Sequence, residues 1–226
     1  MDIAILKAEI THEPVKKQAC DISQLYSNFF DGHHVTFFDV CAQQYPEKHY
    51  DLYVVTGSAA SAYDDTPWVI ALRKFIRHNS DKRILGVCFG HQIIAQSLGG
   101  KVEKVGWNLG CREVFIQKRE AWMEPDSQKI YAIFNHQDQV VVLPENATLI
   151  AGGQQVPIQM YRIADNILCM QHHPEYIAKY QQALMKHIAH VIGDMPTIDD
   201  AMSSYQDAEH LFSMRKWVNA FFAEKI

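Results

Sequence analysis

The 226-residue sequence has no long apolar run, no large basic cluster and no low-complexity tract. Its apolar stretches are well short of the roughly 20 residues that a membrane-spanning helix needs, and the N-terminus lacks the layout of a signal peptide. No basic cluster exceeds two residues and the net charge is −5, which argues against nucleic acid as the main partner. We therefore expect a protein whose partners include neither a membrane nor a nucleic acid.

The sequence also lacks any CxxC pair. Its five cysteines are scattered and odd in number, a pattern that fits neither a disulfide framework nor a zinc site. A reducing, cytoplasmic location fits these cysteines best. The composition is 48% hydrophobic and 21% charged, which is typical of a globular protein, and the length suffices to bury a substantial core.

In the first hundred residues, short apolar runs alternate with amphipathic stretches and turn signals. The order of elements is β-α-β-β-α-β-α, which predicts a mostly parallel sheet covered by helices. Thr66 is the expected N-cap of one helix, with Pro67 at its first position. The predicted strands are 2–6, 35–40, 52–56 and 83–87, and the predicted helices are 16–30, 67–78 and 91–98.

Residues 101–170 have a different character, because short β-like runs alternate there with turns. The runs are 113–117, 130–134, 139–143, 148–151, 158–163 and 167–170. They predict a small antiparallel portion that extends the sheet or lies against its edge. Helices over 175–191 and 208–223 follow, with a break at 193–196. Without a repeat or a linker, we expect one three-layer α/β domain over 1–226, with helices on both sheet faces and a helical extension from about residue 195.

The most informative segment is Gly86-Val-Cys88-Phe-Gly90, where an apolar run passes directly into a helix-like stretch. This arrangement is typical of a nucleophile elbow with cysteine as the nucleophile. Small residues flank Cys88 because the backbone there is strained and neighbouring chain passes close by. A thiol at a helix N-terminus meets the positive end of the helix dipole, which favours the thiolate. The backbone N–H of Phe89 is placed to donate to an oxyanion.

A thiolate also needs a base, and the segment Gln171-His-His-Pro-Glu175 offers one directly after the run 167–170. A histidine at the end of a strand in the same sheet can reach the thiol from about 85 positions away, because catalytic triads are spatial. Two adjacent imidazoles on extended backbone point to opposite sides, so we expect His173 to face Cys88 and His172 to pack or lie at the rim. Taken alone, this segment fits a polar surface turn about equally well.

Together, the two motifs resemble the class I (triad) glutamine amidotransferases, in the branch similar to GMP synthase. That family carries G-x-C-x-G-H-Q and a late H-P-E, which match residues 86–92 and 173–175 here. The resemblance extends to the glycine-bearing turn at Gly57 and to the stretch 63–68. It covers roughly residues 1 to 190.

The resemblance implies Cys88 as nucleophile, His173 as general base and then acid, and Glu175 as the residue that orients the histidine. It also implies that Gly57 and Phe89 supply oxyanion N–H groups. The implied reaction hydrolyses the side-chain amide of glutamine to glutamate and ammonia through a γ-glutamyl thioester. This reaction needs no metal or organic cofactor.

The resemblance further implies that Gln92 contacts the substrate glutamine. A more loosely matching loop, Trp107-Asn108-Leu109-Gly110, is similar to the one that holds the amino-acid end of glutamine in the family, which implies substrate contacts for Asn108, Leu109 and Gly110. His136 falls on a stretch that resembles one near the active-site mouth, and a substrate contact there is the less favoured interpretation. His91 is expected to have a structural role, because its place on the helix turns it away from the thiol.

The sequence has no phosphate loop of the P-loop type, so the chain cannot activate an acceptor with ATP by itself. Either a synthetase acting in trans consumes the ammonia, or the protein is a free-standing hydrolase. A rival hypothesis keeps the triad and changes the substrate to a γ-glutamyl peptide such as glutathione. Two further alternatives are a non-catalytic regulatory subunit and a redox-sensing or chaperone-like protein. The presence of the triad residues argues against the former, and Gln92 with the late H-P-E argues against the latter.

Overall fold

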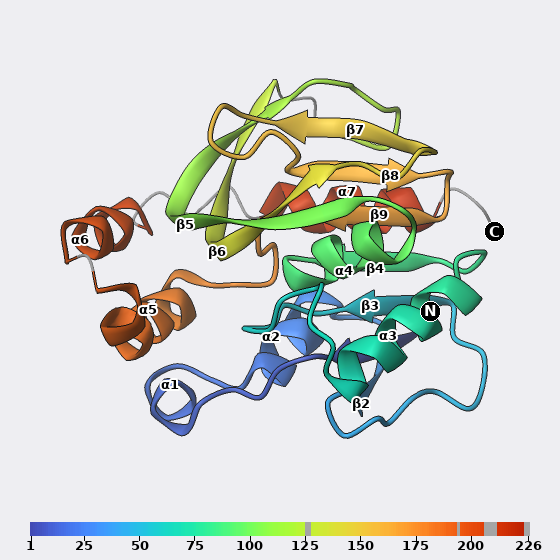
Figure 1. Ribbon diagram of the computed structural model, residues 1–226, viewed down its shortest axis with the longest axis horizontal. Helices are drawn as coiled ribbons and strands as arrows, with labels where there is room; N and C mark the ends of the chain where they lie inside the picture. Colours follow the sequence, from blue (N-terminus) through green and yellow to red (C-terminus); the bar gives the residue numbers. More distant parts are fainter. Residues whose placement is uncertain (125–127, 194, 206–211, 224–226) are drawn as a thin grey trace.

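The computed structural model describes residues 1–124, 128–193, 195–205 and 212–223, and its strands form one nine-stranded sheet within those residues (Figure 1). The strands are β1 Asp2–Lys7, β2 His34–Asp39, β3 Leu52–Val55, β4 Ile84–Val87, β5 Lys101–Ile116, β6 Lys129–Val142, β7 Ala147–Gly152, β8 Met160–Ile163 and β9 Ile167–Met170. Their order across the sheet is β2-β1-β3-β4-β9-β8-β7-β5-β6.

The first five strands of this order are parallel, which confirms the predicted α/β class. Successive side chains of a strand point to opposite faces. On β1, Ile3 and Ile5 accordingly enter one hydrophobic core, while Ala4 and Leu6 enter the other. Because these strands are parallel, the loops that follow β1, β3, β4 and β9 meet at one edge of the sheet.

The antiparallel part is larger than the sequence predicted and belongs to the same sheet. Its long β5–β6 ribbon replaces the separate short runs that the sequence predicts. The runs 130–134 and 139–143 are one strand, so Asn135–Asp138, predicted as a loop, lies within β6. The residues of this stretch carry polar side chains. The pattern of apolar residues therefore gave no indication that one strand continues through them.

Helices cover both faces of the sheet. They are α1 Glu13–Gln18, α2 Ile22–Phe29, α3 Pro67–His78, α4 Phe89–Ser97, α5 Ala178–Ile192, α6 Met195–Ser204 and α7 Phe212–Ala223. Helices α3 and α4 pack into one core, whereas α1, α2, α5, α6 and α7 contribute to the other. This arrangement gives the expected three layers, and α7 crosses behind β9 in Figure 1.

The helix predicted over 16–30 was wrong, because the chain forms two helices there. The backbone N–H of Ile22 donates to Thr11 Oγ1 at 2.8 Å, and that of Ser23 donates to Asp21 Oδ1 at 2.9 Å. These bonds start a new helix at Ile22 and leave Ala19 as the C-cap of α1. The apolar spacing continues across the break, so periodicity alone could not locate it.

Other boundaries differ less. Helix 67–78 is confirmed with Pro67 at its start, although the Thr66 side chain makes no capping bond. Helix α5 begins at Ala178 instead of residue 175, and α6 occupies part of the predicted break. Positions 208–211 of the last predicted helix lie outside the described residues. In the described parts of the chain, no helix is both long and apolar enough to cross a membrane.

Candidate active site

Cys88 lies between β4 and α4 on strained backbone, with φ 53° and ψ −105°. A non-glycine residue at positive φ is uncommon and costs about 1–3 kcal/mol, and such strain clusters at functional sites. The backbone is held there by a bond from Cys88 N–H to Met170 O of 2.9 Å and one from Gln92 N–H to Cys88 O of 3.1 Å. The side chain is 4% exposed, so the thiol sits in a buried elbow at the start of a helix.

The two glycines that flank the elbow are required by close packing. A Cβ on Gly90 would lie 2.1 Å from the Val55 carbonyl oxygen, and one on Gly86 would lie 2.6 Å from Ile94 Cδ1. Gly90 N–H also donates to Thr56 O at 3.1 Å, which ties the elbow to the end of β3. These contacts confirm the predicted reason for small residues on both sides of Cys88.

His173 is brought beside Cys88 by the loop after β9. Its Nδ1 is 2.9 Å from Glu175 Oε1, and both side chains are almost completely buried. Nδ1–H therefore donates to the carboxylate, which leaves Nε2 available to the neighbouring Cys88 side chain, whose interaction with His173 contributes to the raised pKa of the imidazole. His173 N–H donates to Ile133 O of β6 at 2.9 Å, which fixes the loop across the sheet. The three side chains are thus connected in series.

The environment of His173 favours its charged form. Burial alone lowers the pKa of this imidazole, but the nearby charges of Glu175 and Cys88 and the hydrogen bonds to both raise the pKa well above its usual value. His172 shows the opposite behaviour, because burial and the neighbouring His173 lower its pKa to about 3. The two adjacent imidazoles are therefore shifted in opposite directions, because the surroundings of His173 favour its protonated form and those of His172 favour its neutral form.

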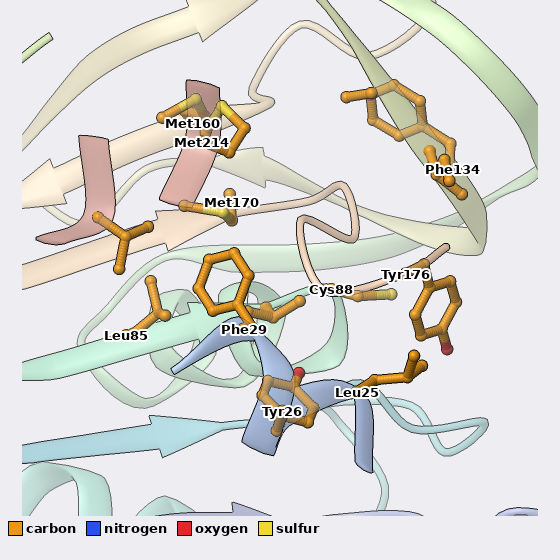
Figure 2. Close-up of a cluster of buried hydrophobic side chains, with 14 of the residues drawn as sticks. Leu25, Tyr26, Phe29, Leu85, Cys88, Phe134, Met160, Met170, Tyr176 and Met214 are labelled. Carbon is orange, nitrogen blue, oxygen red and sulfur yellow. The ribbon is translucent and has the colours of Figure 1, made fainter. Parts of the chain in front are cut away.

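Three residues of this cluster were not predicted from the sequence. Tyr26 of α2 donates to Glu175 Oε1 at 3.1 Å, and Gln171 Nε2 lies 3.6 Å from Cys88 Sγ. The Tyr176 ring stacks on His173 with centroids 3.9 Å apart and planes 11° apart. Figure 2 shows the Cys88 sulfur directed toward the side on which Tyr176 lies. Tyr26 is 149 positions from Glu175 in the sequence, so nothing in the local sequence indicated this contact.

Gly57 and Phe89 lie on either side of the thiol. A Cβ on Gly57 would be 2.9 Å from His173 Cε1 and 3.8 Å from Cys88 Cβ, so a side chain there would displace the imidazole. Phe89 is the first residue of α4, and its N–H is among those that helix geometry leaves without an intrahelical acceptor. Both backbones therefore lie close to the Cys88 side chain.

A cavity of about 620 Å³ opens in front of Cys88 and His173. Gln92 lines it and is fixed by two bonds from its Nε2, to Asp138 O at 2.7 Å and to Gln171 Oε1 at 3.1 Å. Its amide hydrogens are thereby used, and the amide oxygen is left for a substrate. The cavity's volume is within the range of about 300–1,000 Å³ that holds drug-sized ligands.

The predicted head-group loop lies only partly at this cavity. Trp107 lines the Cys88 cavity, whereas Asn108 and Leu109 line a second cavity of about 900 Å³ that Trp107 also borders. Asn108 Nδ2 is 3.5 Å from Gln155 Oε1, and Gly110 packs against Ser204 and Ala201 of α6. Asn108, Leu109 and Gly110 are therefore not among the residues that line the Cys88 cavity. The pairing of β5 with β6 changes register between Lys104 and Asn108, where Gly106 has a positive φ of 110°.

Of the other histidines considered in the sequence analysis, two pack in the core and one lines the Cys88 cavity. His91 is fully buried against Tyr161, and His172 is fully buried against Phe134, so both have packing environments. His136 lines the Cys88 cavity, where its Nδ1–H donates to Asp138 O at 3.1 Å. Burial and the charge on His173 lower the pKa of His136 to about 3, against that hydrogen bond. His136 is therefore a neutral imidazole in the cavity lining, and its Nε2 is buried without a hydrogen-bond partner in the described part of the chain.

Potential metal ligands are dispersed over the molecule. Within the described ranges, no three His, Cys, Asp or Glu side chains come together in a group that could hold a metal ion.

Comparison with known proteins gives a consistent assignment. The chain is 38% identical over 161 residues to gamma-glutamyl peptidase 4 of Arabidopsis thaliana, covering 65% of this chain and 63% of that protein. It is 38% identical over 101 residues to a glutamine-hydrolyzing GMP synthase subunit of Methanosphaera stadtmanae, covering 43% of this chain and 53% of that protein. A glutamine amidotransferase structure from Thermotoga maritima superposes with a TM-score of 0.79 at 17% identity, over 98% of this chain and 97% of that one, and so supports the fold. Residues 24–190 match the family Glutamine amidotransferase class-I, and the chain therefore belongs to that family.

Proposed function

We propose that this protein is a cysteine hydrolase that cleaves γ-glutamyl amide bonds, with Cys88, His173 and Glu175 as its triad. The observation that carries the proposal is the buried series from Glu175 through His173 to the strained Cys88, at the floor of a cavity. A thiolate paired with an imidazolium is the activated form of a cysteine nucleophile. A reduced thiol of this kind also suits the cytoplasmic location that is part of this proposal.

The reaction proceeds in two balanced halves. The Cys88 thiolate attacks the γ-carbonyl carbon, and the electron pair moves to the carbonyl oxygen, which accepts bonds from the N–H groups of Gly57 and Phe89. The C–N bond then breaks as His173 Nε2–H gives its proton to the departing nitrogen, which leaves a γ-glutamyl thioester. Water attacks this thioester while His173 takes its proton, the C–S bond breaks, and glutamate is released with the thiolate restored.

The substrate is proposed to extend beyond the scissile bond. The cavity in front of Cys88 is of the size that accommodates drug-sized molecules, which are larger than free glutamine. Similarity to a protein named gamma-glutamyl peptidase supports the same choice. A γ-glutamyl peptide or other γ-glutamyl amide is therefore the preferred substrate class.

Glutamine itself is the second candidate, with ammonia passed to a synthetase in trans. This alternative is favoured by the similarity to a protein named as a glutamine-hydrolyzing subunit of GMP synthase. Both substrates present the same γ-carbonyl and the same amino-acid head, so the triad would act on either.

The test is to incubate the protein separately with L-glutamine, glutathione and γ-glutamylethylamide, and to measure glutamate and ammonia. We expect glutamate from γ-glutamylethylamide or glutathione, lost in Cys88→Ala and kept in Cys20→Ala, which removes a thiol outside the cavity. Ammonia from glutamine alone would instead support the amidotransferase alternative. If none of the three substrates is hydrolysed, or if Cys88→Ala retains the activity, the proposal is wrong.

A further inference from the structure

Besides Asp138 of β6, a further carboxylate outside the triad lines the active-site cavity. Glu9 lies just beyond β1, at the same sheet edge as the loops that carry Gly57, Cys88 and His173. Its side chain lines the cavity together with Cys88 and His173. The position follows from the parallel order of the strands, although nothing in the local sequence around Glu9 indicates a site.

The Glu9 carboxylate makes no hydrogen bond or ion pair with any residue in the described part of the chain. Burial raises its pKa to about 7; His173 and Lys7 act against the rise, and Glu175 adds to it. A partly buried carboxylate without a partner is unfavourable. Such a group gains most from a ligand that brings a positive charge or an N–H donor to it.

The cavity has two distinguishable walls. The charge of Glu9 acts on His173, Glu175 and Tyr176, so Glu9 belongs to the wall that carries the general acid. The other wall comes from α4 and β6, where Gln92 is bonded to Asp138. In the proposed reaction His173 gives its proton to the departing nitrogen. The leaving group therefore lies against the wall that contains His173 and Glu9.

We infer that Glu9 is a specificity-determining residue that binds a cationic group on the leaving side of the substrate, which makes γ-glutamyl conjugates of diamines or polyamines the favoured substrates. This inference rests on the proposed γ-glutamyl hydrolase activity. The Glu9 carboxylate repels an anionic leaving group of the same length. A neutral leaving group gains and loses no charge–charge interaction with Glu9.

The test compares γ-glutamyl conjugates of putrescine, n-butylamine and γ-aminobutyrate, which share one chain length and end in ammonium, methyl and carboxylate. Glutamate release is measured at about pH 8, where a carboxyl group with a pKa of about 7 is mostly ionised. We expect the putrescine conjugate to exceed the n-butylamine conjugate in kcat/KM by about tenfold, with the γ-aminobutyrate conjugate slowest. Because Glu9 also acts on His173, each kcat/KM is expressed relative to that of the n-butylamine conjugate in the same variant, and we expect Glu9→Gln to bring the putrescine ratio and the γ-aminobutyrate ratio to about one.

The matched control is Glu13→Gln, which makes the same charge change at an exposed position of α1 and keeps the order. The inference is overturned if Glu9→Gln keeps the order, if wild type shows no order, or if Glu9→Gln slows all three substrates alike. If wild type hydrolyses none of the three, the proposed function fails and this inference fails with it. If wild type hydrolyses the n-butylamine conjugate and Cys88→Ala does not, the proposed function holds. A failure of the expected order then concerns only the role of Glu9.

Discussion

The two halves of the sheet contribute to the candidate site in different ways. In the parallel half, each contributing residue lies directly after a strand: Gly57 after β3, Cys88 after β4 and the loop to His173 after β9. In the antiparallel half, residues such as His136 and Asp138 reach the cavity from within the long strand β6. The first half holds the reacting groups, and the second supplies a wall.

This difference has a topological cause. Parallel strands end at one edge, so residues that follow them meet there whatever the intervening sequence. In an antiparallel ribbon, the side chains that reach a cavity depend on register and bulges, which are long-range properties. The sequence therefore predicts the parallel contribution well and the antiparallel contribution poorly.

Among variants that test this comparison, Glu175→Gln in the parallel half is expected to lower kcat/KM the most. The variant loses the charge that raises the pKa of His173, so kcat/KM falls by about 10²–10⁴. A lower pKa for His173 means that the imidazolium is lost at a lower pH, so the alkaline limb of the pH profile moves toward acid. The profile of kcat/KM and the rate of Cys88 alkylation measure this. Glu145→Gln, at an exposed position, should leave the profile in place, and an unmoved profile in Glu175→Gln would contradict the assignment.

The next largest loss of activity is expected from Gly57→Ala, because the added Cβ would lie 2.9 Å from His173 Cε1. A displaced imidazole is expected to lower kcat/KM by about tenfold to a hundredfold. The antiparallel half offers a matched variant, Gly153→Ala, whose Cβ meets Gln159 Nε2 at an ordinary 3.5 Å and should change activity less than about twofold. Equal losses of kcat/KM in Gly57→Ala and Gly153→Ala would contradict the view that the parallel half holds the reacting groups.

Tyr26→Phe tests the support of the triad from outside the sheet. It removes one hydrogen bond to the Glu175 carboxylate, and we expect kcat/KM to fall by about three- to tenfold. Combined with Glu175→Gln, it should cause almost no further loss, because the two residues act through the same bond. Steady-state kinetics of the four members of this cycle provide the measurement, and full additivity would show that Tyr26 acts independently of Glu175.

The smallest effect is expected from Asn108→Ala. The side chain faces the second cavity, so KM should change by less than about twofold, whereas Gln92→Ala raises KM. A rise in KM for Asn108→Ala comparable to that for Gln92→Ala would show that Asn108 also contacts the substrate, and the division of the cavity walls would need revision.

The sequence predicted the elbow, the late histidine and the alternation of strands and helices along the first hundred residues, because each depends on the local chain. The strand–turn–helix at Cys88 needs small residues on both sides, and the contacts of Gly86 and Gly90 supply the reason. It could not predict the break between α1 and α2, because the hydrogen bond from Ile22 N–H to Thr11 Oγ1 joins residues on the two sides of α1 and leaves the apolar spacing unchanged. Nor could it predict Tyr26 as the partner of Glu175, since 149 positions separate them.

The sequence by itself determined the α/β class and the segments that carry the thiol and the imidazole, because these follow from residue type, local spacing and the order of the elements. Only the tertiary structure decided which histidine of the adjacent pair is charged, since His172 and His173 differ in their neighbours and not in their chemistry. It also decided that Glu9 faces the cavity and that Asn108 does not. Both outcomes depend on strand order and register, which are set by packing between distant segments.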